Sequence, residues 1–166
     1  MILKIFTFVH VLISLAGIFT GFVVLLGLLS GKRLDSWTAL FLTTTVATSV
    51  TGFFFPVDHF MPSHAVGIIS LVVLGVAIYA RYTRRLAGGW RNAYVVSAMI
   101  ALYSNVFVGI VQAFLKVPAL KALAPMQSEP PFKLTQLTVL LLFVGLAVAA
   151  AIRFRKEPIL APLPIQ

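Results

Sequence analysis

Residues 5–29 read IFTFVHVLISLAGIFTGFVVLLGLL and contain no Asp, Glu, Lys or Arg. A helix of about 20 residues, rising 1.5 Å per residue, crosses a hydrocarbon layer of roughly 30 Å. Four further stretches are equally free of charge, and none shows the alternation of polar and apolar residues that membrane β-strands carry; they are residues 37–57, 65–80, 92–115 and 134–152. The sequence therefore predicts an all-α integral membrane bundle of five transmembrane helices, at about residues 5–29, 37–55, 62–82, 92–115 and 134–152.

The composition supports the same class. Of the 166 residues, 60% are hydrophobic and 10% are charged, whereas a soluble domain carries about 25% charged residues. A water-soluble core of this size could not bury so much apolar surface. We expect a single domain over residues 1–156, followed by a Pro-rich tail at 157–166. No small-x-small cleavage site follows the first apolar stretch, which predicts a retained helix and not a signal peptide.

The charges predict the orientation. The 13 Lys and Arg residues outnumber the 4 acids, and they cluster in short connections between apolar runs, which favours a bilayer surface over nucleic acid as the partner. By the positive-inside rule, the richer set of connections is cytoplasmic, so the amino terminus is outside and the tail is in the cytoplasm. The richer set holds Lys32, Arg33, Arg81, Arg84, Arg85, Arg91, Arg153, Arg155 and Lys156, and the other holds Lys4, Lys116, Lys121 and Lys133.

The first pair of predicted helices resembles the second pair in layout. His10 precedes Trp37, and His64 precedes Trp90, at nearly the same spacing, and each pair brackets a basic turn. Two hairpins of the same orientation are typical of a parallel repeat about an axis along the membrane normal. The spacing predicts such a repeat of two hairpins, with the fifth helix as an addition.

Polar residues recur at helical spacing inside the apolar stretches. His10, Ser14, Gly17 and Gly21 share one face of the first helix, and small residues four apart allow close helix packing. Elsewhere, Thr44, Thr48 and Gly52 form a stripe, and Asn105 and Gln112 share a face of the fourth helix. We expect Thr44, Thr48, Asn105 and Gln112 to be polar contacts within the bundle. A polar path for a small solute is the alternative.

The outer side holds every histidine of the chain. His10, His59 and His64 lie there with Asp58, and an ionisable residue inside a span, as His10 is, requires an explanation. Imidazoles from different helices suit axial ligation of a b-type haem, which predicts His10 and His64 as its ligands. With His59 or Asp58 added, the set would suit zinc or copper. A quinone headgroup is a third option, and simple interfacial anchoring is the alternative to any ligand.

Three segments carry a resemblance: TTTVATSVTGFFFP at 43–56, HAVGIISL at 64–71 and APMQSEPPF at 124–132. In these the chain is similar to a group of uncharacterised small bacterial inner-membrane proteins, which implies a multi-pass inner-membrane protein and brings no activity with it. In layout the chain also resembles small four-helix membrane cytochromes, a likeness that rests on His10 and His64.

These observations predict a small membrane module with an outward-facing histidine site for b-type haem or a transition metal, serving electron transfer. An accessory subunit of a larger membrane complex, or a homo-oligomer, is one alternative. A facilitator for a small neutral solute is another. No acid, base and nucleophile set is identifiable, and the spans carry no P-loop or mid-helix lysine, so the sequence makes no prediction of catalysis.

Overall fold

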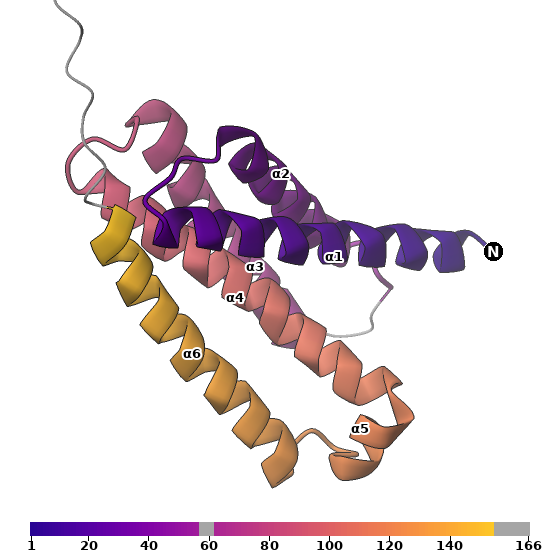
Figure 1. The fold of residues 1–166 in the computed structure, drawn as a ribbon. Helices are drawn as coiled ribbons and strands as arrows, with labels where there is room; N and C mark the ends of the chain where they lie inside the picture. The colour runs from indigo at the N-terminus through magenta and orange to yellow at the C-terminus, as the bar shows by residue number, and fades with distance from the viewer. Residues whose placement is uncertain (57–61, 155–166) are drawn as a thin grey trace, which may run out of the picture.

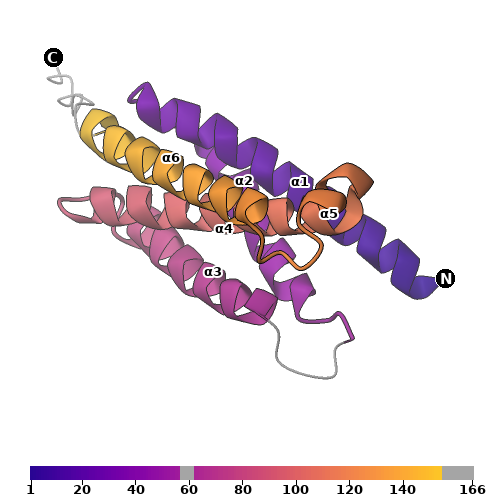
Figure 2. The same cartoon turned by 90° about the horizontal axis from the view of Figure 1, so that it is seen from below.

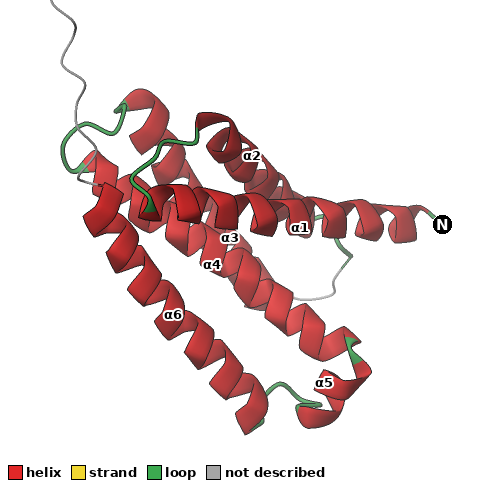
Figure 3. Ribbon diagram, viewed as in Figure 1, coloured by secondary structure: helices red, strands yellow, loops and turns green. Residues whose placement is uncertain are grey.

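The computed structural model describes residues 1–56 and 62–154. Every regular element in these ranges is a helix (Figure 1; Figure 3). The elements are α1 (Ile2–Leu29), α2 (Asp35–Gly52), α3 (Pro62–Ile78), the π-helical segment η1 (Tyr79–Thr83), α4 (Trp90–Lys116), the short α5 (Pro118–Leu123) and α6 (Pro130–Phe154). The all-α prediction is confirmed for the described part of the chain. Asp58, His59 and the tail at 157–166 lie outside the described residues.

Four of the helices are long and apolar enough to cross a membrane. They cover Ile2–Leu29, His64–Thr83, Trp90–Lys116 and Pro130–Phe154. The helix α2 is not among them, although it is 18 residues long. Eight of its residues carry a hydroxyl group, which lowers its hydropathy; they are Ser36, Thr38, Thr43, Thr44, Thr45, Thr48, Ser49 and Thr51. The predicted fifth crossing therefore remains a prediction, and α2 also ends earlier than residue 55.

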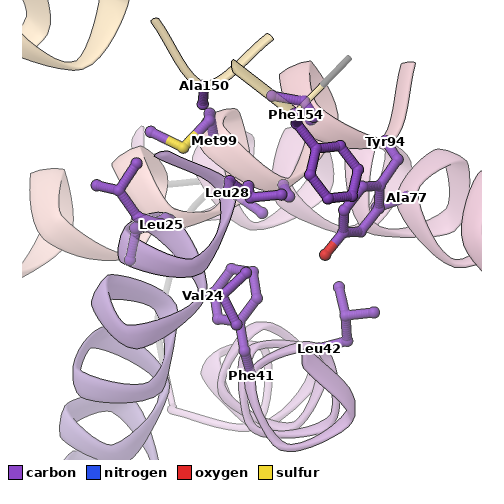
Figure 4. Packing of buried hydrophobic residues seen from close by; sticks show 14 of the residues in the cluster. Val24, Leu25, Leu28, Phe41, Leu42, Ala77, Tyr94, Met99, Ala150 and Phe154 are labelled. Carbon is purple, nitrogen blue, oxygen red and sulfur yellow. The ribbon is translucent and has the colours of Figure 1, made fainter. Parts of the chain in front are cut away.

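The helices pack as two hairpins, α1–α2 and α3–α4, and α4 lies at the centre of the bundle. The pairs α1–α2 and α3–α4 form the closest packing, α2 also contacts α3, and α6 lies against α4 and α1 (Figure 2). The parallel repeat of the two hairpins stays a prediction. Their tryptophans differ in packing, since Trp37 packs on Phe19, while Trp90 packs on Tyr79. The buried core gathers where α1 ends and α4 begins (Figure 4). In contrast, the N-terminal half of α1 extends past α2 and is largely exposed (Figure 1).

Close approach explains the small-residue face of α1. A Cβ atom added at Gly21 would lie 2.4 Å from Cδ1 of Leu102 and 2.9 Å from the ring of Phe41. At Gly17 it would lie 3.2 Å from the side-chain nitrogen of Asn105. The glycines therefore let α1 press against α2 and α4, as small residues do between membrane helices.

The connection between α4 and α6 folds back onto the bundle. It contains α5, which lies between the predicted helices 92–115 and 134–152 and was not among them. The side chain of Gln127 donates a hydrogen bond to the Val111 carbonyl, at 2.9 Å. The rings of Phe114 and Phe132 pack edge to face with centroids 5.3 Å apart. These contacts hold the connection over the end of α4.

Candidate functional site

His10 is held by the last turn of α2. It lies half-buried on α1, and its Nδ1 is 2.8 Å from Oγ1 of Thr51. The Thr51 hydroxyl lies 2.6 Å from the carbonyl oxygen of Ala47, and a carbonyl can only accept a hydrogen bond. Because a hydroxyl has one proton and Thr51 donates it to Ala47, the imidazole Nδ1 must be the donor in its own bond to Thr51. The neutral ring therefore keeps its lone pair on Nε2.

The surroundings of His10 are aromatic and apolar. The Phe55 ring meets His10 edge to face, with ring centroids 5.0 Å apart. The Phe6 ring also packs on Phe55, with centroids 5.0 Å apart. Beside them is an open hollow of about 430 Å³, lined by Ile2, Leu3, Phe6, Phe54 and Pro56. An imidazole with a lone pair thus stands next to a surface suited to an apolar ligand or to lipid chains.

The second histidine lies elsewhere. His64 stacks on Phe53, with ring centroids 5.6 Å apart and an angle of 26° between the planes. Phe53 follows Thr51 by two residues, which corresponds to about 200° around a helix. His10 and His64 therefore contact opposite sides of the end of α2. The structure brings both histidines to the end of α2, His10 through Thr51 and His64 through Phe53, and their joint ligation of a haem stays a prediction.

The other two predicted metal ligands, Asp58 and His59, lie outside the described residues. Within the ranges 1–56 and 62–154, no group of three or more His, Asp or Glu side chains is placed to hold a metal ion.

A row of polar side chains runs along the inner face of α2. Asn105 is buried on α4 and donates a hydrogen bond to Oγ1 of Thr45, at 3.2 Å. Ser49 bonds to Ser70 of α3 at 3.0 Å. Thr44 donates to its own backbone at Leu40, at 2.7 Å. The Asn105–Thr45 and Ser49–Ser70 hydrogen bonds join two helices, and the Thr44 bond joins two turns of α2.

Two of the predicted polar contacts differ from this pattern. Thr48 lies one turn from Thr44 and from Thr51, and its buried Oγ1 has no hydrogen-bond partner among the described residues. Gln112 is exposed near the end of α4. It does not share the buried position of Asn105.

The sequence reasoning missed a cluster at the opposite end of α2. Arg81, in η1, is buried and forms an ion pair with the exposed carboxylate of Asp35. Its guanidinium lies 5.2 Å from the ring centroid of Tyr94, whose hydroxyl is 3.4 Å from Oγ1 of Thr38. Arg81 was assigned to a cytoplasmic turn. Arg81 directly follows the charge-free stretch 65–80 and so continues the same predicted helix. That position was the sequence signal that could have indicated its burial.

Comparisons of this chain with protein families, with curated proteins and with solved structures find no match. Functional assignment therefore depends on the chemistry of the residues described above.

Proposed function

We propose that the protein is an integral membrane protein of the bacterial cytoplasmic membrane, with five crossings and its amino terminus outside. The buried hydroxyl groups of α2 support the fifth crossing. Thr38, Thr45 and Ser49 are buried against other helices, while Trp37 and Leu40 are exposed. In a helix that faces lipid, polar groups must find partners inside the bundle. The segregation of charges to the connections supports the orientation.

Within this protein, His10 binds the iron of a b-type haem or a transition-metal ion through Nε2. The observation that carries the proposal is the hydrogen bond from Nδ1 to Thr51. A histidine that ligates a metal usually donates its other ring N–H to an oxygen, which fixes the tautomer and the ring orientation. Thr51 performs this function here, and its own proton is engaged by the Ala47 carbonyl.

His10 is the histidine that we assign to the ligand, because Thr51 fixes its ring, whereas His64 stacks on Phe53. Electron transfer is the activity that such a centre would serve, because haem and copper change oxidation state without a catalytic acid or base.

The test is an absorbance spectrum and metal analysis of detergent-purified protein from haem-supplemented cells. The native chain should show a Soret band or about one metal ion per chain, and His10→Ala should remove it. His64→Ala is the matched control and should retain the ligand. Thr51→Val should retain it with affinity lowered about 10- to 100-fold, as expected when the partner of a ligating histidine is lost. Absence of both band and metal, or a His10→Ala protein that keeps its ligand, would refute the assignment.

One observation favours a second candidate, a facilitator for a small neutral solute. The unpartnered hydroxyl of Thr48 lies in the polar row between Thr45 and Thr51, where a passing hydroxyl or amide could bond to it. Flux of glycerol or urea into proteoliposomes should then fall in Thr48→Val and Asn105→Leu. Equal flux with native protein and with empty liposomes would remove this candidate.

An accessory role in a larger membrane complex is the third candidate. The helix α6 exposes most of its apolar residues, including Leu134, Leu141 and Val148. Stoichiometric partners after mild solubilisation, together with no bound cofactor, would favour this role over the other two.

A further inference from the structure

One end of the bundle gathers arginines from three separate connections. The guanidinium of Arg153, at the end of α6, donates to the Leu29 carbonyl at 3.3 Å. Arg91, at the start of α4, lies 5.8 Å from the ring centroid of Phe154. The ion pair of Arg81 with Asp35 joins the end of α3 to the start of α2. These contacts bring the turns 30–34 and 84–89 and the end of α6 together.

Five exposed cations of this end form what we call the basic end face: Lys32, Arg33, Arg84, Arg85 and Arg153. Asp35 is the one carboxylate at this end among the described residues, and Arg81 is its partner. In the part of the chain that the structure describes, this face therefore presents an excess of positive charge, and its one carboxylate is already paired with Arg81.

The two ends of the bundle use different cations. Every arginine in the described ranges lies at this end, whereas the opposite end carries lysines alone, at Lys4, Lys116, Lys121 and Lys133. A guanidinium presents a planar fork of donors that matches the oxygens of a phosphate, while an ammonium acts as a point charge. The choice of arginine favours phosphate over a diffuse interaction with any anion.

The turn that carries Arg84 and Arg85 is held in place. Leu86 is buried, and its N–H donates to the Ala80 carbonyl at 3.0 Å. The guanidinium of Arg84 lies 5.3 Å from the ring centroid of Trp90, and Trp90 packs in turn on Tyr79. Such stacking reduces the conformational entropy that a free arginine would lose on binding a ligand.

We propose that the basic end face binds the phosphate groups of anionic phospholipids in the leaflet that it meets, with Arg84 and Arg85 as the main contacts. The position of the face supports a lipid as the source of the phosphate, because Trp90 and Tyr79 beside it are the residues that favour the headgroup level of a bilayer. The proposal rests on membrane insertion of the chain and is independent of any ligand at His10.

The test uses Trp90 as a reporter. Trp37 is the one other tryptophan, so Trp37→Phe leaves Trp90 alone. This variant is placed in phosphatidylcholine bilayers that contain equal fractions of brominated phosphatidylglycerol or brominated phosphatidylcholine, and quenching of its fluorescence is compared. We expect stronger quenching by the anionic lipid. Adding Arg84→Gln and Arg85→Gln should remove most of that excess, because each cation at an anionic surface contributes a factor of about five.

Two controls separate the outcomes. Lys116→Gln with Lys121→Gln, at the other end, should leave the excess unchanged, and Arg84→Lys with Arg85→Lys should lower it partly if the guanidinium fork matters. Equal quenching by both lipids, or an excess that survives the glutamine changes, would overturn the proposal. Loss of the excess on adding inorganic phosphate, but not chloride at equal ionic strength, would assign the face to a free anion instead. Quenching by neither lipid would contradict membrane insertion itself.

Discussion

The Thr51 hydroxyl illustrates how much one group can decide at the residue scale. Its oxygen is 2.6 Å from the Ala47 carbonyl and 2.8 Å from Nδ1 of His10, and its single proton can serve only one of them. The carbonyl takes the proton, so the imidazole must donate. A threonine that bonds to its own backbone is common in helices, but here the bond also orients the lone pair of a neighbouring histidine.

Gly21 should be intolerant of any side chain. Its Cβ position is 2.4 Å from Leu102 and 2.9 Å from Phe41, and both of those side chains are buried. We expect Gly21→Ala to lower the free energy of unfolding by about 1–3 kcal/mol, the usual cost of overpacking. Gly145→Ala is the matched control, because nothing lies within 4 Å of its Cβ position. That change should be neutral or raise stability by about 0.5–1 kcal/mol, since alanine favours the helix. Denaturant titration in mixed micelles measures both, and equal losses would contradict the packing of α1.

Glu129 should titrate below its ordinary range. Desolvation acts to raise the pKa of Glu129, but backbone hydrogen bonds and the charge of Lys133 outweigh it and hold the pKa below 4.5. Two of those bonds come from the N–H groups of Met126 and Ser128, at 3.2 Å and 3.0 Å. Because the folded pKa is lowered, the stabilising contribution is complete above about pH 4.5 and is lost as the pH falls through the lowered value.

Carboxyl NMR of glutamate-labelled protein checks this shift. Glu157→Gln leaves Glu129 as the only glutamate, and its titration midpoint should lie below that of a free glutamate side chain. Lys133→Gln should raise the midpoint part of the way. A midpoint at or above 4.5 would contradict the turn at 126–129.

At the scale of the element, the residues of α2 and η1 explain how polar groups are accommodated inside the bundle. Three of the five buried residues of α2 carry a hydroxyl group, while the apolar side chains of Trp37 and Leu40 are exposed, whereas a soluble amphipathic helix turns its polar face to water. The π-helical turn of η1 adds a residue to the end of α3, and such segments often occur at functional sites. Arg81 lies within it, buried between Tyr94 and Asp35.

The two partners of this ion pair should contribute unequally. Asp35 has 81% of its side chain exposed, whereas Arg81 has 7%. Asp35→Asn should therefore lower the free energy of unfolding by less than about 1 kcal/mol, as for an exposed pair. Arg81→Ala should lower it by about 2 kcal/mol or more, because the cation–π contacts and the packed stem are also lost. The same micelle titration distinguishes them, and equal losses would mean that the ion pair alone matters.

At the scale of the whole molecule, the bundle places its two polar centres at opposite ends of α2. His10 and Thr51 lie at one end, and Arg81 with Asp35 lies at the other. The core between them is densest near the second centre, where α1, α2, α4 and α6 meet (Figure 4). The first centre lies near the exposed half of α1, which leaves it accessible to lipid or to a ligand.

Cysteine labelling tests the number and direction of the crossings, because the chain has no cysteine of its own. Ser36→Cys and Phe54→Cys place exposed thiols at the two ends of α2. If α2 crosses the membrane, an impermeant maleimide applied to intact spheroplasts should label position 54 and not position 36. Arg85→Cys should stay protected until the membrane is opened, and Lys121→Cys should react at once. Labelling of both 36 and 54 from one side would exclude the fifth crossing.

How much of the site could be predicted depends on the range of each signal. The face shared by His10, Ser14, Gly17 and Gly21 follows from helical spacing, and the structure places His10, Gly17 and Gly21 against α2 or α4. The pairing of His10 with Thr51 was not predictable, since it depends on where α1 crosses α2. The same holds for His64, whose stacking on Phe53 follows from the path between α2 and α3. Gln112 has the right spacing from Asn105, yet no helix covers it.

The sequence by itself determined the all-helical class, four apolar helices suited to a bilayer, and the gathering of arginines into alternate connections. These properties depend on residue type and short spacing, because the transfer energy of a side chain into hydrocarbon and the rise of a helix are local quantities. The tertiary structure alone decided which residues of α2 each histidine meets, that Arg81 pairs with Asp35, and that Thr48 has no hydrogen-bond partner among the described residues. Those outcomes depend on the crossing positions of helices far apart in the chain, which are set by packing over many residues at once and leave no signal in any single stretch.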